Sequence, residues 1–409
     1  MNIEKLFSGV AVVIDDEVND SSSNINKIVA QIESAKIPVL KYTSLPEDDI
    51  VSHFQNLSFL LLDWRLIKDS VSSEELEEGV RIPQGLQEYD ATENLKFIEN
   101  LNRNCFCPVF LFTNEDTSSI EDQLQQKGLI YENRPSNLFV KSKSDLQNNG
   151  DLFKKVSDWL KETPSIYVLK EWEKEYQNSK TKLFSELHSI NPFWPTIMWK
   201  NFEADGANKS IEMGDLISRN LHSRMTPFEF ENDILKKESD VPINELRKVL
   251  EGERFLKHTS LHDGDIGTGD LFKEEFQEND ETKVRYYLNI RAQCDLLRES
   301  DPDLFLLSGY ILEQNANGKI KNISFSKGQY LELPNHAVVA FLDDGKIMEF
   351  KFGNLEIKSW SAIKTTRIGR LLPPYIYKIQ QRYSLYMQRQ GVPRIPDAAI
   401  SSGKISGSN

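Results

Sequence analysis

The sequence predicts an α/β protein, in which a doubly wound parallel sheet is followed by a helical linker region and an α+β C-terminal domain. Three observations lead to this prediction. Short continuous apolar runs alternate with helical patterns near the N-terminus, which is typical of strands buried on both faces of a parallel sheet. A charged segment with helical periodicity follows. Beyond it, aromatic and β-branched runs recur without the alternating rhythm of strand and helix.

The composition is consistent with a cytoplasmic multidomain protein. The chain has 409 residues, enough for two or three domains of roughly 100–200 residues each. Hydrophobic residues make up 39% and aromatic residues 10%, which is enough for packed cores. We expect neither a membrane span nor a signal peptide, because the sequence has no apolar run of roughly 18 residues and its start has no apolar core of signal-peptide length. Its three cysteines are too few for a disulfide scaffold.

The formal net charge of -14 is unevenly distributed. Residues 1–165 hold 28 Asp and Glu against 16 Lys and Arg, whereas the remainder is almost neutral. This asymmetry marks a domain boundary, and Pro164 ends the last helical pattern before it. We therefore predict four segments, which are a first domain over 1–164, a helical connector over 165–280, an α+β domain over 281–400 and a flexible tail over 401–409.

The first domain shows five apolar runs that predict strands. Four are continuous and one, at Ile37–Leu40, is weaker. The continuous runs are Val10–Ile14, Phe59–Leu62, Pro108–Phe112 and Asn137–Val140, and the helical patterns between and after them are Asn24–Ser34, Asn94–Leu101, Ile120–Lys127 and Leu152–Trp159.

Polar side chains that could take part in binding or catalysis follow these strands. Asp15 and Asp16 follow the first run, Asp63 the second, Thr113 the third and Lys141 the fourth. In an open α/β sheet these strand ends meet at one edge, where ligands bind. Clustered carboxylates repel one another unless a hard cation such as Mg²⁺ binds them. The lysine and the threonine can then hold the oxygens of a phosphoryl group.

The stretches VVIDDE, LLLDWR, FLFTNE and FVKSKSDL together resemble the receiver domain of two-component response regulators, over about residues 1–160. The resemblance implies a flavodoxin-like sheet and phosphoryl transfer from a histidine kinase to Asp63. It implies that Thr113 and Lys141 hold the phosphoryl oxygens. It further implies a Mg²⁺ site made by Asp15, Asp16, Asp63 and the backbone carbonyl of Arg65.

The sequence departs from the receiver pattern at three places. Ser142 stands where receivers have a proline after the lysine, and Phe139 is the nearest candidate for their aromatic switch residue. The gap from Asp63 to Thr113 is 50 residues, and its extra length predicts an acidic loop over Ile67–Ala91. The structural alternative is that the strand-end residues serve only as loop residues and helix caps.

The connector contains two features with open interpretations. Val168–Ile190 predicts a long amphipathic helix that packs on its own domain or pairs with its copy in a homodimer. His262–Asp270 is rich in Gly and Asp. We expect either a turn-rich connector or a loop that binds a metal or a phosphate. We expect Cys105, Cys107 and Cys294 to be structural core residues, with Cys294 as an alternative nucleophile.

In the last third, aromatic and β-branched runs predict strands at Val284–Ile290, Phe305–Ile311, Ala337–Leu342 and Ile347–Phe352. A hairpin turn is predicted at Asp343–Lys346 and a helix at Tyr375–Gln388. Residues 361–399 hold seven basic residues and one acidic residue. This basic segment leaves nucleic-acid binding open, although an internal packing role is the simpler interpretation.

Stretches such as YYLNIRAQCDL and RQGVPRIP extend the resemblance to the receiver protein of the Detocs anti-phage defence system. It implies a phosphate sink or signalling component whose partners are a histidine kinase and a second receiver-effector protein, with no enzymatic activity beyond its own phosphoryl transfer and dephosphorylation. The alternatives are a phosphorylation-controlled transcriptional regulator that binds nucleic acid and an effector enzyme built around Cys294 or the 262–270 loop.

Overall fold

The computed structural model divides the chain into two compact units, which are described separately. The first unit comprises Met1–Trp194 and Asp215–Ser239, and the second comprises Pro195–Gly214 and Asp240–Asn409. The residues that the structure describes are 6–54, 56–66, 84–132, 134–146, 151–227, 241–262, 264–312, 330–333, 335–391, 393 and 395–396. The predicted tail over 401–409 and most of the predicted acidic loop lie outside them.

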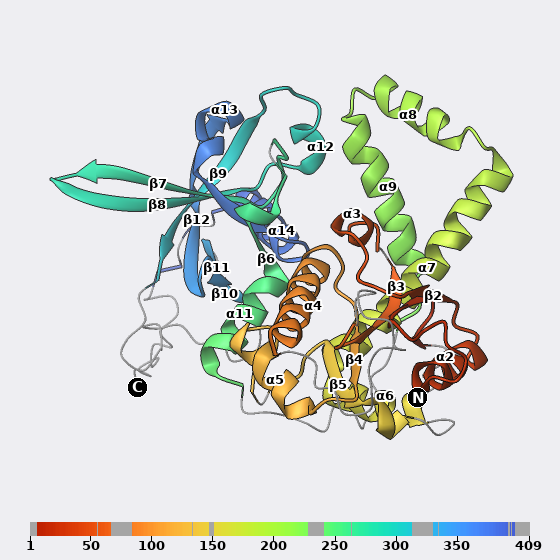
Figure 1. Cartoon of the computed structure of the whole chain (residues 1–409). Coiled ribbons are helices and arrows are strands. Elements are labelled where there is room, and N and C mark those ends of the chain that lie inside the picture. Colours follow the sequence, from red (N-terminus) through yellow and green to blue (C-terminus); the bar gives the residue numbers. More distant parts are fainter. Residues whose placement is uncertain are drawn as a thin grey trace, which may run out of the picture. The chain divides into compact units, whose positions relative to one another are not determined.

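The first unit is built on a five-stranded sheet in which every pairing is parallel (Figure 1). The strand order is β2-β1-β3-β4-β5, the order of flavodoxin-like sheets, so the predicted α/β class is confirmed for this unit. The strands are β1 (Val10–Ile14), β2 (Val39–Tyr42), β3 (Leu57–Asp63), β4 (Val109–Thr113) and β5 (Leu138–Ser142).

Successive side chains of a strand point to opposite sides of a sheet. Here the side chains on both sides are apolar, and helices bury them on both faces. Val13 and Leu61 belong to one buried apolar cluster, whereas Val12 and Leu62 belong to the other. Burying each such side chain stabilises the fold by about 1.5–3 kcal/mol. The connecting elements are α2 (Asn24–Ser34), α3 (Asp48–Val51), α4 (Gln84–Asn104), α5 (Thr117–Gln126), the 3₁₀ turn η1 (Lys143–Leu146) and α6 (Asp151–Glu162).

Two helix boundaries differ in an informative way from the sequence prediction. Helix α4 begins at Gln84, inside the stretch predicted as an acidic loop, and residues 67–83 lie outside the described part of the chain. Pro164 follows the end of α6 and stands in the first turn of α7 (Pro164–Ile190), where its missing N–H costs no helical hydrogen bond.

Helix α7 corresponds to the predicted amphipathic connector. Its N-terminal half packs on its own unit, since Ile166 and Tyr167 join the cluster that contains Leu61. Lys170 is also buried, and its Nζ donates to the Leu57 carbonyl oxygen at 2.8 Å. Trp172 remains 45% exposed. The N-terminal half of this helix thus packs within the chain, on the first unit, beyond the boundary that was predicted at residue 164.

The second unit contains an eight-stranded antiparallel sheet in the order β10-β11-β12-β9-β8-β7-β13-β6. This sheet begins earlier in the chain than residue 281, where the α+β segment was predicted to start. Its strands are β6 (Phe255–Lys257), β7 (Asp270–Glu278), β8 (Glu281–Asn289), β9 (Asp303–Ile311), β10 (Tyr330–Leu333), β11 (His336–Leu342), β12 (Lys346–Ser359) and β13 (Arg367–Leu371).

Helix α14 (Tyr375–Gln388) matches the predicted C-terminal helix and packs on this sheet. Ile376 and Ile379 are fully buried in a cluster with Leu288 and Phe350, so the predicted internal packing role of this helix is confirmed. The predicted turn is also present, with Gly345 at a φ of 76°. The remaining helices and 3₁₀ turns of the chain are α8 (Trp194–Ala204), α9 (Lys209–Arg224), α11 (Ile243–Arg254), η2 (His258–Ser260), α12 (Gln293–Leu296), α13 (Trp360–Ile363) and η3 (Lys364–Thr366).

Among the described residues, none of the helices combines the length and the apolar character needed to cross a membrane.

Candidate functional site

The candidate site lies at the carboxyl edge of the parallel sheet. Asp15 directly follows β1, Asp63 ends β3 and Thr113 ends β4. The registers align these ends, since Ile14 pairs with Leu62 in the neighbouring strand. The topology therefore brings together residues that lie far apart in the sequence.

Three carboxylates converge there. One oxygen each from Asp15, Asp16 and Asp63 lies within 4.8 Å of the others. Opposite ligands of an octahedral Mg²⁺ ion stand about 4.2 Å apart, given bonds of roughly 2.1 Å. This all-oxygen set therefore fits a hard divalent cation after a small adjustment. Asp15 is fully buried and Asp63 is 6% exposed, so water alone does not compensate their charges.

Lys143 is the cation that contacts these carboxylates. Its Nζ donates to Asp15 Oδ2 and to Asp63 Oδ2, each at 2.8 Å. Burial by itself would lower the pKa of the Lys143 ammonium, but the charges of Asp63 and Asp15 raise it above its ordinary value. Lys143 is therefore a fixed positive charge held between the two buried acids.

The lysine at the carboxylates is Lys143 and not Lys141, the residue that the sequence predicted to hold phosphoryl oxygens at this site. Lys141 lies within β5, and its Nζ is 5.4 Å from the centre of the Phe139 ring, two residues earlier in the same strand. The sequence suggested a strand end at Val140, whereas β5 continues to Ser142. The 3₁₀ turn that opens at Lys143 then directs this later lysine to the carboxylates.

Burial and the charge of Asp15 raise the pKa values of the two neighbouring carboxyl groups. Burial raises the pKa of Asp63 from 3.8 to about 7, with Lys143 lowering it and Asp15 raising it further. Burial and the Asp15 charge also raise the pKa of Asp16. Below about pH 7 Asp63 thus favours the neutral form, unless further positive charge such as that of a bound divalent cation is supplied.

This shift predicts a stability that depends on pH and on metal. Unfolded Asp63 titrates near 3.8 and folded Asp63 near 7, so the folded state holds this proton more tightly. The resulting stabilisation is complete below the unfolded pKa and is lost as pH rises through 7, by a few kcal/mol. In EDTA, we expect the melting temperature to fall between about pH 5.5 and about pH 8.5.

Adding Mg²⁺ should restore the melting temperature at the higher pH. A ligand that binds only the folded state adds about 2.7 kcal/mol to the free energy of unfolding at a hundredfold excess over its Kd. The Asp63→Asn variant has no charge at this position and should melt with a weaker pH dependence and a smaller Mg²⁺ response. Thermal melts of both proteins at the two pH values check this. An equal Mg²⁺ response in both would show that the ion binds elsewhere.

Thr113 and Arg65 make local contacts at the ends of β4 and β3. Thr113 is fully buried, and its Oγ1 accepts from the Glu115 N–H at 3.0 Å. The Arg65 N–H donates to Asp63 Oδ1 at 3.3 Å, and its guanidinium lies 3.5 Å from the Glu115 carboxylate. The Arg65 residue therefore already holds one oxygen of Asp63 through its backbone.

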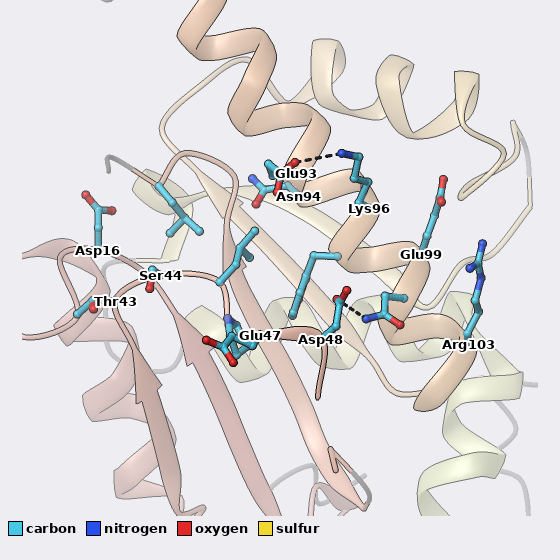
Figure 2. A pocket seen from close by; sticks show the side chains of 15 residues that line it. Asp16, Thr43, Ser44, Glu47, Asp48, Glu93, Asn94, Lys96, Glu99 and Arg103 are labelled. Atoms are coloured by element: carbon cyan, nitrogen blue, oxygen red, sulfur yellow. Dashed lines mark hydrogen bonds and ion pairs between the residues drawn. The ribbon is translucent and has the colours of Figure 1, made fainter. Parts of the chain in front are cut away.

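Sequence reasoning missed Asn94, a buried residue of α4. Its Nδ2 donates to the Trp64 carbonyl oxygen at 2.5 Å and so anchors the loop after Asp63. Asn94 also lines a cavity of about 1000 Å³ between α4 and the segment that joins β2 to α3. Figure 2 shows Asp16 and Ser44 at one end of this cavity and Arg103 at the other. The cavity therefore extends away from the carboxylate cluster along α4.

The Gly- and Asp-rich loop over 262–270 is held by arginines of β13. Arg370 Nε donates to the fully buried Asp270 at 2.6 Å, and its Nη1 contacts Asp265 Oδ2 at 2.9 Å. Arg367 lies 3.6 Å from Asp270, whose second oxygen also accepts from the Gly267 N–H at 2.9 Å. These pairs support the turn-rich connector, because the loop carboxylates face internal cations.

We expect Asp270→Ala to destabilise the second unit by about 3–5 kcal/mol, because it leaves the Arg370 and Arg367 guanidinium groups without their buried acid. Asp265→Ala is the matched control, since the Asp265 side chain is 29% exposed, and should cost about 1 kcal/mol or less. Urea unfolding followed by circular dichroism measures both. Similar small losses of stability in the two variants would contradict the role of Asp270 in holding the 262–270 loop on β13.

Cys294 was expected to be buried, and this was wrong. It is exposed on α12, while Leu296 and Leu297 take the buried face of that single turn. Its Sγ donates to Asp295 Oδ1 at 3.6 Å, so the described contact of this thiol is with a carboxylate and not with a histidine or a cation. The geometry thus gives no support to the alternative of a catalytic cysteine at this position.

No family model matches the chain, and a search of curated proteins found no match.

Proposed function

We propose that the first unit accepts a phosphoryl group on Asp63 from the phosphohistidine of a histidine kinase, with Mg²⁺ as cofactor, in the manner of the receiver domains that its sequence resembles. The observation that carries this proposal is the arrangement at the sheet edge. Lys143 bridges Asp15 and Asp63 at 2.8 Å, and the oxygens of Asp15, Asp16 and Asp63 lie within 4.8 Å of one another.

The chemistry follows from these contacts. An Asp63 oxygen attacks the phosphorus of the donor, the P–N bond breaks and the imidazole leaves. Asp15, Asp16 and Asp63 would hold Mg²⁺, together with the backbone carbonyl of Arg65. Bound Mg²⁺ would neutralise charge on the transferring group. Lys143 then moves from its pair with Asp63 to the phosphoryl oxygens, where Thr113 donates its hydroxyl.

We further propose that the protein acts as a phosphate sink or signalling component in anti-phage defence. The support is the resemblance of the whole chain together with the second unit, in which the two candidates for a separate active site have internal roles or unfavourable surroundings. Asp270 in the 262–270 loop pairs with arginines, and Cys294 faces Asp295. A sink needs phosphoryl transfer alone, which the first unit can supply.

Nucleic-acid binding by the basic C-terminal segment is the second candidate. Its observation is the excess of Lys and Arg over 361–399. Two of those residues, Arg367 and Arg370, are already paired with Asp270, and Arg389 stacks on Tyr386 at 3.9 Å. This internal use reduces the charge available to phosphates and favours the first candidate.

One assay tests the proposal and separates the two candidates. The full chain is incubated with a labelled small acyl phosphate, or with a phosphorylated kinase domain, in Mg²⁺ and in EDTA. We expect one acid-stable, base-labile phosphoryl group per chain in Mg²⁺ and none in EDTA. A parallel DNA titration at increasing salt should show no specific binding. Metal-independent labelling, or salt-sensitive specific DNA binding without labelling, would contradict the proposal.

A further inference from the structure

The two side-chain oxygens of Asp63 are held by two different donors. Lys143 Nζ donates to Oδ2 at 2.8 Å, and the Arg65 N–H donates to Oδ1 at 3.3 Å. We propose that Asn94 is a positioning residue for Asp63, and that it acts through the peptide group that precedes Arg65. The inference rests on the proposed function, because Asp63 is the residue that would accept the phosphoryl group.

The link from Asn94 to Asp63 runs through one rigid group. Asn94 Nδ2 donates to the Trp64 carbonyl oxygen at 2.5 Å. That carbonyl and the Arg65 N–H belong to the same peptide group, whose six atoms lie close to one plane. A tilt of the carbonyl oxygen therefore also tilts the N–H that faces Asp63 Oδ1. By holding the oxygen at one side of this group, Asn94 fixes the direction of the N–H at the other.

The Asn94 amide has one possible orientation and a protected position. A carbonyl oxygen only accepts hydrogen bonds, so the amide atom that faces it must be the nitrogen. Asn94 is 1% exposed, so water has little access to this bond. Trp64 is also buried, in the apolar cluster that contains Leu95 and Phe97 of α4. Helix α4 therefore fixes the peptide group by a buried hydrogen bond and by side-chain packing.

The carboxylate of Asp63 needs both donors to keep one orientation. The terminal torsion of an aspartate side chain is broad, so a single donor does not fix the plane of the carboxylate. Lys143 at one oxygen and the Arg65 N–H at the other do fix it. The contact with Arg65, at 3.3 Å, is just beyond the usual range of about 2.7–3.2 Å for an N–H···O bond. A small displacement of the peptide group would therefore break it.

A fixed carboxylate matters for phosphoryl transfer, because reacting groups that already stand in the right geometry avoid the cost of orienting them. In the proposed reaction Lys143 moves to the phosphoryl oxygens, and the Arg65 N–H is then the donor that stays on Asp63. Arg65 also supplies the backbone carbonyl proposed for the metal site. Asn94 thus supports both the nucleophile and the metal site through the chain segment that it anchors.

The variant Asn94→Leu keeps a branched side chain but lacks the amide nitrogen. We expect the single-turnover rate at saturating acyl phosphate to fall about tenfold to a hundredfold, the usual cost of removing a group that orients a metal ligand. The acyl phosphate concentration at half-saturation should change by less than about threefold, because Asn94 acts on the acceptor and not on the donor. Calorimetric titration of the unphosphorylated variant should show a Kd for Mg²⁺ raised about tenfold.

The matched control is Asn100→Leu. Asn100 lies on the same helix and lines the same cavity, but its Nδ2 donates to Asp48 Oδ1 at 2.6 Å, on α3. Its replacement should leave the transfer rate and the Mg²⁺ affinity close to wild type. Asn94→Gln keeps an amide donor beside the cavity and should recover part of the rate. Melting curves confirm that each variant is folded, and Asn94→Ala, which adds no volume, replaces Asn94→Leu if that variant does not fold.

Amide hydrogen exchange tests the positioning role without metal or phosphoryl transfer. In the full wild-type chain, the Arg65 N–H should exchange at least about tenfold more slowly than in an unstructured peptide, although Arg65 stands outside the helices and strands. Asn94→Leu should remove most of this protection. It should leave the exchange of the Glu115 N–H, which donates to Thr113 Oγ1 at the end of β4, unchanged.

These outcomes separate the role of Asn94 from the proposed function. Exchange of the Arg65 N–H at the peptide rate in wild type would overturn the positioning role, and so would equal rates and equal exchange in the Asn94 and Asn100 variants. A wild-type protein with no label on Asp63, but with Arg65 protection that depends on Asn94, would contradict the phosphoacceptor proposal and still support the positioning of Asp63 by Asn94.

Discussion

An Asp63→Asn variant is expected to incorporate no phosphoryl group from a small acyl phosphate in Mg²⁺. The amide keeps the shape of the side chain but lacks the nucleophilic oxygen, and no other group within the carboxylate cluster reaches the same position between Lys143 and the Arg65 N–H. The loss should therefore be complete rather than partial. Incorporation is measured by radiolabel or by intact mass.

The matched control is Asp158→Asn, an acid on α6 whose side chain is 62% exposed and forms an ion pair with Lys161. It carries the same chemical change and should be labelled like wild type. Wild-type labelling of Asp63→Asn would remove the phosphoacceptor from this site. Loss of labelling in both variants would point to a defect in folding rather than in chemistry.

Replacing Lys143 by Ala should slow phosphoryl transfer by about a hundredfold or more, the usual cost of removing one preorganised charge from a reacting group. Lys141→Ala should change the rate by less than about threefold, because its ammonium lies over Phe139 and not at the carboxylates. The two lysines are two residues apart in the same chain segment, so each variant is the control of the other. Single-turnover labelling at saturating Mg²⁺ gives both rates.

The Lys143 variant also needs a check on its fold, since it removes the partner of two buried acids. Its melting temperature in Mg²⁺ should stay high enough for assay, because the cation takes over part of the charge compensation. If the two lysines exchanged their effects, the phosphoryl oxygens would be held by Lys141 as the sequence first suggested.

The polarity pattern of the sequence predicts where some strands of the first unit end, but not where β5 ends. β1, β3 and β4 end where a continuous apolar run gives way to Asp15, Asp63 or Thr113, so their ends can be predicted from the sequence. β5 ends in Lys141-Ser142 and is followed directly by Lys143-Ser144, so no change in polarity marks the last strand residue. Only the turn after Ser142 decides which lysine reaches the cluster, and that turn is set by tertiary packing.

The second unit shows the same limit for β7. Its sequence, DLFKEEFQE, is rich in charge, so it was read as part of a helical connector. The turn that joins it to β8 contains Asn279 and Asp280, which both take positive φ, at 55° and 60°, as a tight hairpin turn requires. Asn94 could not have been found in this way, because its role depends on a contact with Trp64, 30 residues earlier.

The measurement that bears most directly on the account is the chemical location of the phosphoryl group. After labelling in Mg²⁺, borohydride reduces an aspartyl phosphate to homoserine, which peptide mass spectrometry places on a single residue. We predict that the converted residue is Asp63 and that no conversion occurs in EDTA. Conversion at another aspartate, or a phosphoryl group that resists borohydride, would contradict the assignment of this site.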